Sequence, residues 1–424
     1  MRNGFCSFSA PLKIALATAL LLPIGSHAAH SANDMGFKSP LKMSETSNDY
    51  VPRYSNGLYS TIAGFLNIQD SQIKNVRELQ LTVPGFKSRV PVKAVIQPHA
   101  APLVIVIPGL DGKADSKLGK LWPAWYSEAG YHVLTFDSTF TWSFNAVSGH
   151  GASGHIGVEA QCVRDLVESF LKSDAIKDKV SRIGVVGMSY GGIQALMLGQ
   201  MQKDNALPFK IDAIQVWSPP VNMQRTCEIL DKWYAEDRWN YTLAELATKM
   251  SSHKPVAPGK SIPFSDEEMR AGIAAVFRLD LANLILKTDR AYKLNLLPSG
   301  NNEFDAEDVR KDHASTWGFQ RFVSELTFPY WEKRLKLGSV EELTSSFELR
   351  TLLPKQASHT EVIIAADDPF NTAEDLMALD SVKKECALNV LKGGGHLGFV
   401  AENWTKAKLL TLFKTSAAEL ASSK

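Results

Sequence analysis

The sequence predicts an α/β fold in which a mostly parallel central sheet is flanked by helices. Six short runs of almost continuous apolar residues are typical of strands buried on both faces, as in a parallel sheet. These runs are 103–107, 132–136, 183–187, 211–217, 361–366 and 387–391. Helical patterns lie between most of them, at 157–173, 191–203 and 403–416. Strands that alternate with helices predict parallel pairing through right-handed crossovers.

Two stretches before the first buried run predict an N-terminal β-hairpin. Residues 77–83 (RELQLTV) and 88–96 (SRVPVKAVI) alternate apolar and polar side chains, and Pro84 and Gly85 lie between them. Alternation with a period of two, bounded by turn residues, is typical of strands with one solvated face. The hairpin therefore precedes the parallel part of the sheet.

A long segment, 221–358, separates the fourth buried run from the fifth. It holds two Ser-x-x-Glu patterns, which are typical of helix starts, at Ser265 with Glu268 and at Ser339 with Glu342. Its four tryptophans are Trp233, Trp239, Trp317 and Trp331. We expect this segment to form a helical cap over one end of the sheet.

The first residues resemble a secretory signal peptide. Arg2 and Lys13 precede an apolar run at 14–25, and small residues follow it, which predicts cleavage after Ala28. The run is shorter than the roughly 20 residues of a membrane span, so no stable span is expected after cleavage. An uncleaved anchor is the alternative. The expected location is the periplasm or the outside of the cell.

The expected organisation has five segments. A signal peptide covers 1–28 and a flexible polar arm covers 29–60. The α/β core follows in two parts, 61–220 and 359–424, with the cap insert at 221–358 between them.

Composition excludes several classes of protein. The chain has 46 Lys and Arg against 45 Asp and Glu, so its net charge of +1 does not favour nucleic acid as a partner. Once the signal has left, Cys162, Cys227 and Cys386 remain, which permits at most one internal disulfide. Their spacing matches no zinc site, and we expect no metal.

Ser189 is the candidate nucleophile. It follows a buried run, stands in the pattern Gly-x-Ser-x-Gly between Gly187 and Gly191, and precedes a helical stretch. A serine at a sharp strand-to-helix turn needs small neighbours, and the helix N-terminus favours developing negative charge. The backbone N–H of Tyr190, the next residue, is then one expected oxyanion donor.

An acid and a base follow Ser189 in the order that this architecture requires. Asp367 and Asp368 end one buried run, and His396 follows the next. Because the carboxyl ends of parallel strands meet at one sheet edge, we expect these groups near Ser189. Adjacent side chains at a strand end point in opposite directions, so only one aspartate faces His396. Asp368 begins the turn that Pro369 enforces.

The second oxyanion donor is expected in residues 108–112 (PGLDG), most simply the N–H of Leu110. A plain Pro-Gly turn is the alternative. His150 and His155 lie in a glycine-rich stretch that is either an ordinary loop or the mouth of a pocket. His359 precedes its strand, at the wrong end of the sheet for a base.

The motifs PGLDG, GMSYGG, AADDPF and GGHLGF, in this order, resemble the α/β-hydrolase superfamily from about residue 76 to the C-terminus. Residues 303–331 are similar to a segment of its YheT-like branch, which includes the lung-type α/β hydrolases. The resemblance implies an esterase-like enzyme that acts on lipid or acyl esters without a cofactor. Ala365 and Phe370 fit the family pattern around Asp368 as the acid.

The chain departs from the branch at several positions. Pro108 stands where the family has a histidine, and Met188 and Tyr190 replace the more usual Phe and Leu. The insert is also longer than usual. These changes put substrate inference from the branch in doubt, while the triad assignment stands.

The resulting prediction is an exported serine hydrolase that cleaves carboxylic esters through Ser189, His396 and Asp368. The expected partner is a small ester or acyl substrate, and the oligomeric state is not indicated. The alternatives are a peptidase or amidase, or a thioesterase, with the same triad. A binding module without catalysis is the alternative from another class, which the complete set of three residues disfavours.

Overall fold

The computed structural model describes residues 49–236, 245, 248–250, 252–298, 303–356, 359–382 and 386–414. The expected signal peptide, most of the expected arm and Trp239 lie outside the described residues.

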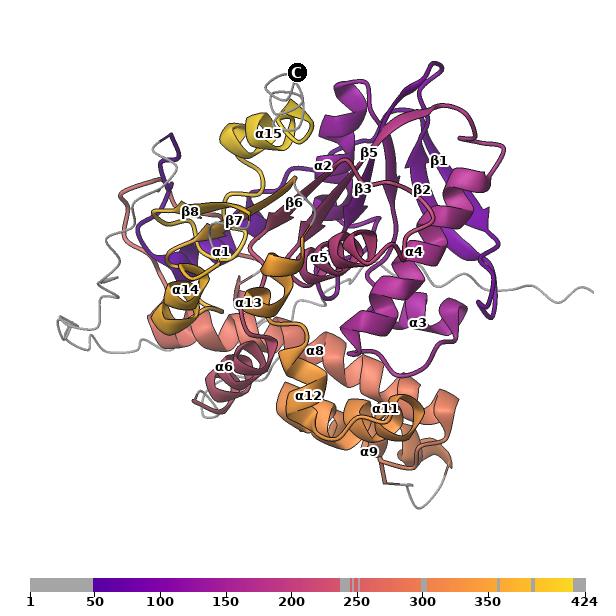
Figure 1. The fold of residues 1–424 in the computed structure, drawn as a ribbon. Helices are drawn as coiled ribbons and strands as arrows, with labels where there is room; N and C mark the ends of the chain where they lie inside the picture. Colours follow the sequence, from indigo (N-terminus) through magenta and orange to yellow (C-terminus); the bar gives the residue numbers. More distant parts are fainter. Residues whose placement is uncertain are drawn as a thin grey trace, which may run out of the picture. The chain divides into compact units, whose positions relative to one another are not determined.

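One mixed sheet lies at the centre of the described chain (Figure 1). Its strands are β1 Val76–Leu81, β2 Val90–Val95, β3 Ala101–Ile107, β4 His132–Thr135, β5 Val180–Met188, β6 Ala213–Trp217, β7 Thr360–Ala365 and β8 Ala387–Leu391. They lie in the order β1-β2-β4-β3-β5-β6-β7-β8. The β1–β2 and β2–β4 pairs are antiparallel and all other pairs are parallel. The predicted fold class, with its N-terminal hairpin, is confirmed.

The strand order reverses around β3. Strand β4 pairs with one edge of β3, and β5 pairs with the other. Such a reversal opens a crevice outside the carboxyl ends of the strands, which is where open α/β sheets bind ligands. The loops that leave β3 and β5 begin at Pro108 and Ser189, so the expected oxyanion loop and the candidate nucleophile lie on the two sides of this crevice.

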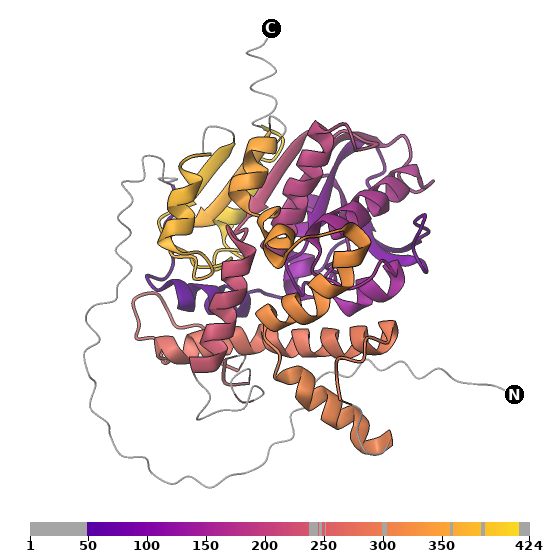
Figure 2. The same ribbon diagram turned by 60° about the horizontal axis from the view of Figure 1, so that its bottom comes forward.

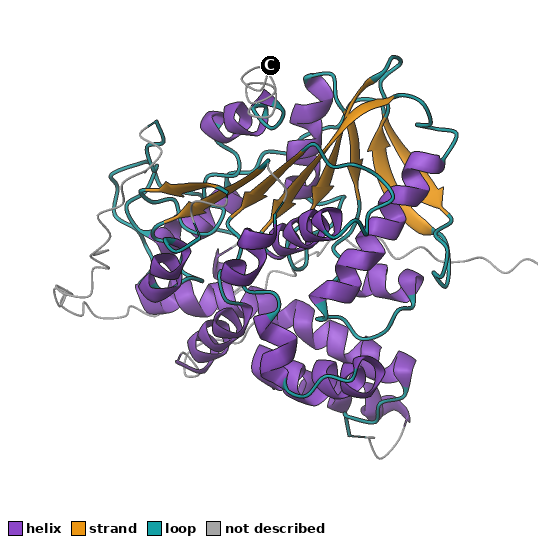
Figure 3. Cartoon of the chain, in the orientation of Figure 1, coloured by secondary structure: helices purple, strands orange, loops and turns teal. Residues whose placement is uncertain are grey.

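Helices cover both faces of the sheet (Figure 3). Those of the core are α1 Gly57–Leu66, α2 Lys117–Glu128, α3 Trp142–Ser148, α4 Ile156–Lys172, α5 Tyr190–Lys203, α14 Ala373–Leu379 and α15 Asn403–Leu409. Alternate side chains of β3 point to opposite faces of the sheet. Val104 and Val106 join the hydrophobic cluster that includes Trp122 of α2. Leu103 and Ile105 join the cluster that contains the apolar sides of α4 and α5.

The described elements between β6 and β7 are all helical, as predicted for the insert (Figure 2). They are α6 Met223–Glu236, α8 Asp266–Tyr292, α9 Glu303–Ser315, α10 Phe319–Phe322, the π-helix η1 Val323–Thr327, α11 Phe328–Leu335, α12 Val340–Ser345, α13 Leu349–Leu352 and the 3₁₀-helix η2 Leu353–Lys355. Ser265 and Glu268 form the full capping box that starts α8. Ser339 caps α12 by accepting from the Glu342 N–H.

The insert, called the cap below, is bonded to the core at several places, two of which involve buried aromatic side chains. Tyr54 Oη donates to Val256 O at 3.0 Å, and Val256 N donates to Tyr59 Oη at 2.8 Å. Trp331 Nε1 donates to Ala152 O at 2.9 Å in the glycine-rich loop after α3. Buried aromatic side chains from both parts thus satisfy backbone groups of the other.

Residues 49–60 differ from the flexible arm that the polar composition predicted. Tyr50, Tyr54 and Tyr59 are buried, and helix α1 begins at Gly57 with Asn56 as its N-cap. Asp49, Arg53 and Ser55 are exposed and Asn56 caps the helix, while the tyrosines account for most of the burial. Composition averaged over the stretch concealed this division.

None of the described helices is both long enough and apolar enough to cross a membrane. Cys162 and Cys227 are buried free thiols, and Cys386 is half-buried.

Candidate active site

Ser189 lies at the turn between β5 and α5 in a strained backbone conformation, with φ +50°. The glycines around it permit a close approach of chain segments. A Cβ on Gly191 would stand 2.2 Å from Pro108 O, and one on Gly187 would stand 2.4 Å from Gly191 O. Both distances are prohibitive for any side chain. Glycine is therefore required on both sides of the serine, because α5 begins directly against the end of β3.

The structure brings Ser189, His396 and Asp368 together. Ser189 Oγ lies 2.9 Å from His396 Nε2, and His396 Nδ1 lies 2.9 Å from Asp368 Oδ2. A carboxylate only accepts hydrogen bonds, so Nδ1 carries the proton and Nε2 is left to accept from the serine hydroxyl. Both Asp368 and His396 are 2% exposed. This is the arrangement in which an imidazole removes a proton from a serine.

Asp367 points away from the imidazole. Its Oδ1 accepts from Gly395 N at 2.8 Å, in the loop that carries His396. Burial raises the pKa of Asp367, while the N–H groups of Gly395 and Gly394 act in the opposite direction. Asp367 therefore shapes the histidine loop, and Asp368 contacts the ring.

Helix α1 supports the histidine loop, which the sequence did not indicate. His396 N donates to Thr61 Oγ1 at 2.8 Å. Gly395 has φ +60°, and a Cβ there would lie 2.1 Å from Gly57 O. The apolar helical pattern of 57–66 is a signal for this helix in the sequence. The expected arm, 29–60, overlaps the first turn of the helix.

The two expected oxyanion donors lie beside the serine. Tyr190 is the first residue of α5, so its N–H has no acceptor within the helix. On the other side, a Cβ on Gly109 would lie 3.5 Å from Ser189 Cβ, which brings the loop with Leu110 next to the nucleophile. Leu110 and Tyr190 also line the same cavity.

That cavity has a volume of about 320 Å³ and lies between the serine turn and the cap. Its lining is mainly apolar and comes from the core, from α6 and from the segment between α10 and α12. Its apolar members are Leu110, Phe140, Ile156, Met223, Cys227, Phe319, Phe322, Val323, Val340, Leu343 and Phe347. A cavity of this size and polarity suits an acyl chain or another small apolar group.

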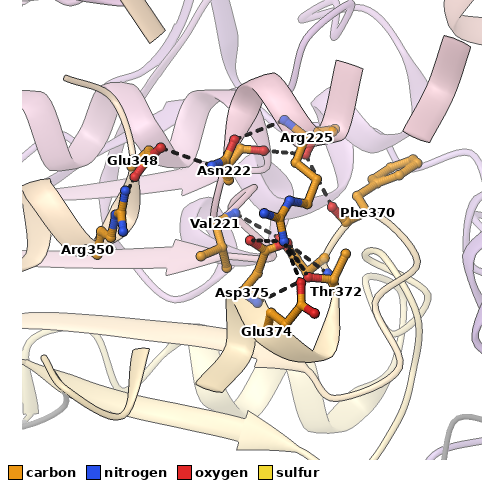
Figure 4. Close-up of polar contacts among 11 residues, drawn as sticks. Val221, Asn222, Arg225, Glu348, Arg350, Phe370, Thr372, Glu374 and Asp375 are labelled. Atoms are coloured by element: carbon orange, nitrogen blue, oxygen red, sulfur yellow. Dashed lines mark hydrogen bonds and ion pairs between the residues drawn. The ribbon is translucent and has the colours of Figure 1, made fainter. Parts of the chain in front are cut away.

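Helix α6 of the cap holds the loop that follows Asp368 (Figure 4). Arg225 Nη1 donates to Thr372 Oγ1 at 3.0 Å and lies 3.1 Å from Glu374 Oε2 and 3.4 Å from Asp375 Oδ1. Val221 N donates to Asn371 Oδ1 at 2.8 Å. The sequence contained no signal for this network, since its members are far apart in the chain.

Phe370 carries the cap's contact to the imidazole. Its ring centroid lies 4.5 Å from that of His396 in an edge-on geometry. Trp233 of α6 and Phe277 of α8 pack against the Phe370 ring, with distances of 5.9 and 5.7 Å between ring centroids. Phe370 N also donates to Asp368 Oδ1 at 3.0 Å. The cap thus reaches the imidazole indirectly, because two of its aromatic side chains pack on Phe370, which contacts His396.

Asp111, next to Leu110, is a second titratable group near the expected oxyanion site. Burial, together with the facing carboxyl of Asp280 on α8, raises the pKa of Asp111 to about 7. Its neutral form is therefore favoured at mildly acidic pH.

The other histidines take structural positions. His155 caps α4 by accepting from Val158 N at 3.1 Å, and His150 packs on Phe144 with its Nδ1 2.5 Å from Ser148 Oγ. His359 lies just before β7, at the opposite end of the strand from Asp368. Among the described residues, no group of three or more His, Cys, Asp and Glu is arranged to hold a metal ion.

The sheet order and the strand–turn–helix at Ser189 form an α/β-hydrolase fold. The chain is similar to the solved structure of the α/β hydrolase GrgF from Penicillium sp. sh18, with 17% identity, a TM-score of 0.45, and coverage of 81% of this chain and 99% of that one. It is also similar to the Pyrococcus furiosus esterase Pf2001, with 14% identity, a TM-score of 0.45, and coverage of 83% and 92%.

A third similar structure is the proline iminopeptidase of Mycobacterium smegmatis, with 13% identity, a TM-score of 0.43, and coverage of 81% and 100%. No protein-family model and no curated protein matches the chain. At such low identities the activity is argued from the site alone.

The two adjacent aspartates are expected to differ in their effect on turnover. Asp368→Asn should lower kcat by about 10⁴, because an amide stabilises the wrong tautomer of the imidazole. Asp367→Asn should cost far less, since it alters only the bond to Gly395. Steady-state kinetics on both variants, with circular dichroism as the control for folding, checks this. The reverse order of damage would make Asp367 the acid.

Ionisation of Asp111 should reduce activity, because its negative charge would oppose an oxyanion held next to Leu110. We expect the ratio of kcat/KM of Asp111→Asn to that of the wild type to be flat below pH 6 and to rise several-fold as pH passes through about 7. Asp280→Asn removes the carboxyl that faces Asp111 and should lower the pKa of Asp111. The activity of this variant should therefore begin to fall at a lower pH than that of the wild type. A ratio that stays flat to pH 9 contradicts the assignment.

Proposed function

We propose that this protein is a serine hydrolase that cleaves carboxylic esters through an acyl-enzyme intermediate. The observation that carries the proposal is the bonded series Ser189–His396–Asp368, with 2.9 Å at each step, next to an apolar cavity that Tyr190 lines. A serine hydroxyl is a weak nucleophile until a base removes its proton, and that base needs an orienting acid. All three parts are present here in hydrogen-bonding geometry.

The reaction proceeds in two halves. Ser189 Oγ attacks the acyl carbon while His396 Nε2 takes its proton, and the N–H groups of Leu110 and Tyr190 stabilise the oxyanion. The imidazolium, stabilised by Asp368, then protonates the leaving alcohol oxygen as the bond to the acyl carbon breaks. Water, deprotonated by His396, then attacks the acyl carbon of the acyl-enzyme. The imidazolium returns the proton to Ser189 Oγ as the bond between the acyl carbon and Oγ breaks, and the acid leaves. The sharp turn at Ser189 and the start of α5 hold the nucleophile and one donor in fixed relation.

The cavity supports an acyl substrate over a charged peptide. Its lining is dominated by aliphatic and aromatic side chains, and it adjoins Tyr190, where the acyl group of the intermediate would lie. Amide, peptide and thioester hydrolysis use the same residues and remain the alternatives. A binding module without catalysis is disfavoured, because it has no need of a strained serine in contact with a buried histidine.

Export from the cytoplasm is a further part of the proposal and rests on the basic and apolar pattern of residues 1–28, which lie outside the described residues. The likeness to the YheT-like branch rests on sequence motifs alone and likewise stays a prediction.

Ser189→Ala should abolish both labelling by a fluorophosphonate and ester hydrolysis, while the protein stays folded. Loss of a triad nucleophile typically costs on the order of 10⁶ in turnover. Gel fluorescence after labelling, together with hydrolysis of p-nitrophenyl esters, measures both effects. Ser169→Ala, on α4 with its hydroxyl bonded to Asp165 O, is the control and should label normally. A Ser189→Ala protein that still labels at one site would move the nucleophile elsewhere.

The length of the acyl chain should set the value of kcat/KM for p-nitrophenyl esters. While the acyl chain fits the cavity, kcat/KM should rise about fourfold for each methylene, since each buried methylene contributes about 0.8 kcal/mol. Val340→Trp narrows the cavity at its rim and should lower the rates of the longest accepted esters but not that of acetate. Val309→Trp, exposed on α9, is the matched control. A flat profile, with faster cleavage of aminoacyl amides, would favour the peptidase alternative.

A further inference from the structure

Glu159 is a buried carboxylate that the proposed reaction does not use. It lies in the first turn of α4, and only 1% of it is exposed. Its Oε2 accepts from Thr139 Oγ1 at 2.5 Å, from Tyr190 Oη at 2.8 Å and from Gln194 Nε2 at 3.0 Å. Its Oε1 accepts from Gly154 N at 2.7 Å. Four donors from three separate segments therefore converge on one side chain.

These donors are neutral, so the carboxylate is solvated by dipoles. Burial raises the pKa of Glu159, and the bonds from Thr139, Gly154, Tyr190 and Gln194 act to lower it. A charged group in such a place is costly unless every lone pair is used, which makes its hydrogen bonds geometrically strict. A group of this kind specifies the positions of its partners.

One partner is the residue that supplies an expected oxyanion donor. Tyr190 follows Ser189 and begins α5, and its hydroxyl binds Glu159. Gln194 lies one turn further along the same helix and binds the same oxygen. Glu159 thus holds the first turn of α5 at two points, and with it the direction of the Tyr190 N–H.

The other expected donor is linked to Glu159 through the loop after β4. Thr139 binds Glu159, and its neighbour Ser138 binds the oxyanion loop twice. Ser138 Oγ donates to Leu110 O at 2.8 Å, and Ser138 N donates to Gly112 O at 2.8 Å. The peptide that carries the Leu110 carbonyl is therefore tied, through two adjacent residues, to the same carboxylate.

We propose that Glu159 is a positioning residue that holds the two backbone donors of the oxyanion hole, the N–H groups of Leu110 and Tyr190, in the correct positions relative to each other. The proposal rests on the proposed function, because it concerns the oxyanion of the same reaction. Gly154, which donates to Glu159 and lines the cavity, adds the glycine-rich loop to this unit.

The carboxylate is required as such, and glutamine is not equivalent. An amide has one acceptor and one donor end, while both oxygens of Glu159 face donors. In Glu159→Gln, either the N–H of Gly154 or the NH₂ of Gln194 must face another NH₂, whereas the hydroxyls of Thr139 and Tyr190 can turn to accept. One end of the network is then broken while the volume is unchanged, which makes this substitution a sharp test.

The test uses kinetics together with an alkyl trifluoromethyl ketone, which adds to the serine and places an oxyanion in the hole. We expect Glu159→Gln to lower kcat per titrated active site by about 10–100-fold, with KM within about threefold. Its inhibition constant for the ketone should rise by the same factor as kcat/KM falls. Glu361→Gln, half-buried at the start of β7 and bonded to Gln215, Asn389 and Lys408, is the matched control and should alter neither value.

Tyr190→Phe and Ser138→Ala each remove one arm of the network and leave both backbone N–H groups in place. Each should weaken ketone binding, by less than Glu159→Gln does, and together they decide the matter if Glu159→Gln fails to fold. The proposal is overturned if the folded variants lose thermal stability but keep wild-type kcat and ketone affinity. If the wild type itself neither hydrolyses esters nor binds the ketone, the proposed function fails instead.

Discussion

The close approach of α5 to the end of β3 is the constraint on which the rest of the site depends. It leaves no room for a side chain at Gly191, the first turn of α5 leaves none at Gly187, and Ser189 between them has φ +50°. Such strain costs of order 1–3 kcal/mol and persists only where the surroundings impose it. Here the surroundings are the buried strands β3 and β5, which pair in parallel through the centre of the sheet. The strained turn points the serine into the crevice.

Three carboxyl groups around this turn have three different environments. Asp368 faces an imidazole, Glu159 is surrounded by neutral donors, and Asp111 faces another carboxyl and has a pKa of about 7. Each solution suits a different task, namely to orient a base, to fix backbone geometry and to stay uncharged near an expected oxyanion. Side chains of one chemical type thus acquire distinct behaviour from burial and partners alone.

The cap takes part in the site as well as covering it. Arg225 of the cap holds the acid loop, Trp233 and Phe277 pack on Phe370, which contacts the imidazole, and Trp331 holds the glycine-rich loop. A change in the cap is therefore transmitted to both the histidine and the cavity wall. Substrate selection and the alignment of the triad share the same contacts.

The sheet, its hairpin, the helical insert and the candidate triad are all predictable from the sequence alone. Each of these depends on local patterns: apolar runs predict buried strands, alternation predicts a hairpin, and a serine between glycines after a strand predicts a sharp turn. Chain order then placed Asp368 and His396, because consecutive parallel strands end at one sheet edge. The ordered stretch at 49–60 was missed, since three buried tyrosines are diluted among polar residues.

The groups that surround the candidate triad can be identified only in the tertiary structure. Thr61, Glu159 and Arg225 lie on helices that precede or follow the motifs by tens to hundreds of residues, and no local pattern marks them. Their roles arise where separate segments bury polar groups together and each must find a partner. Such pairings depend on packing in three dimensions, whereas strand burial and turn geometry are encoded along the chain.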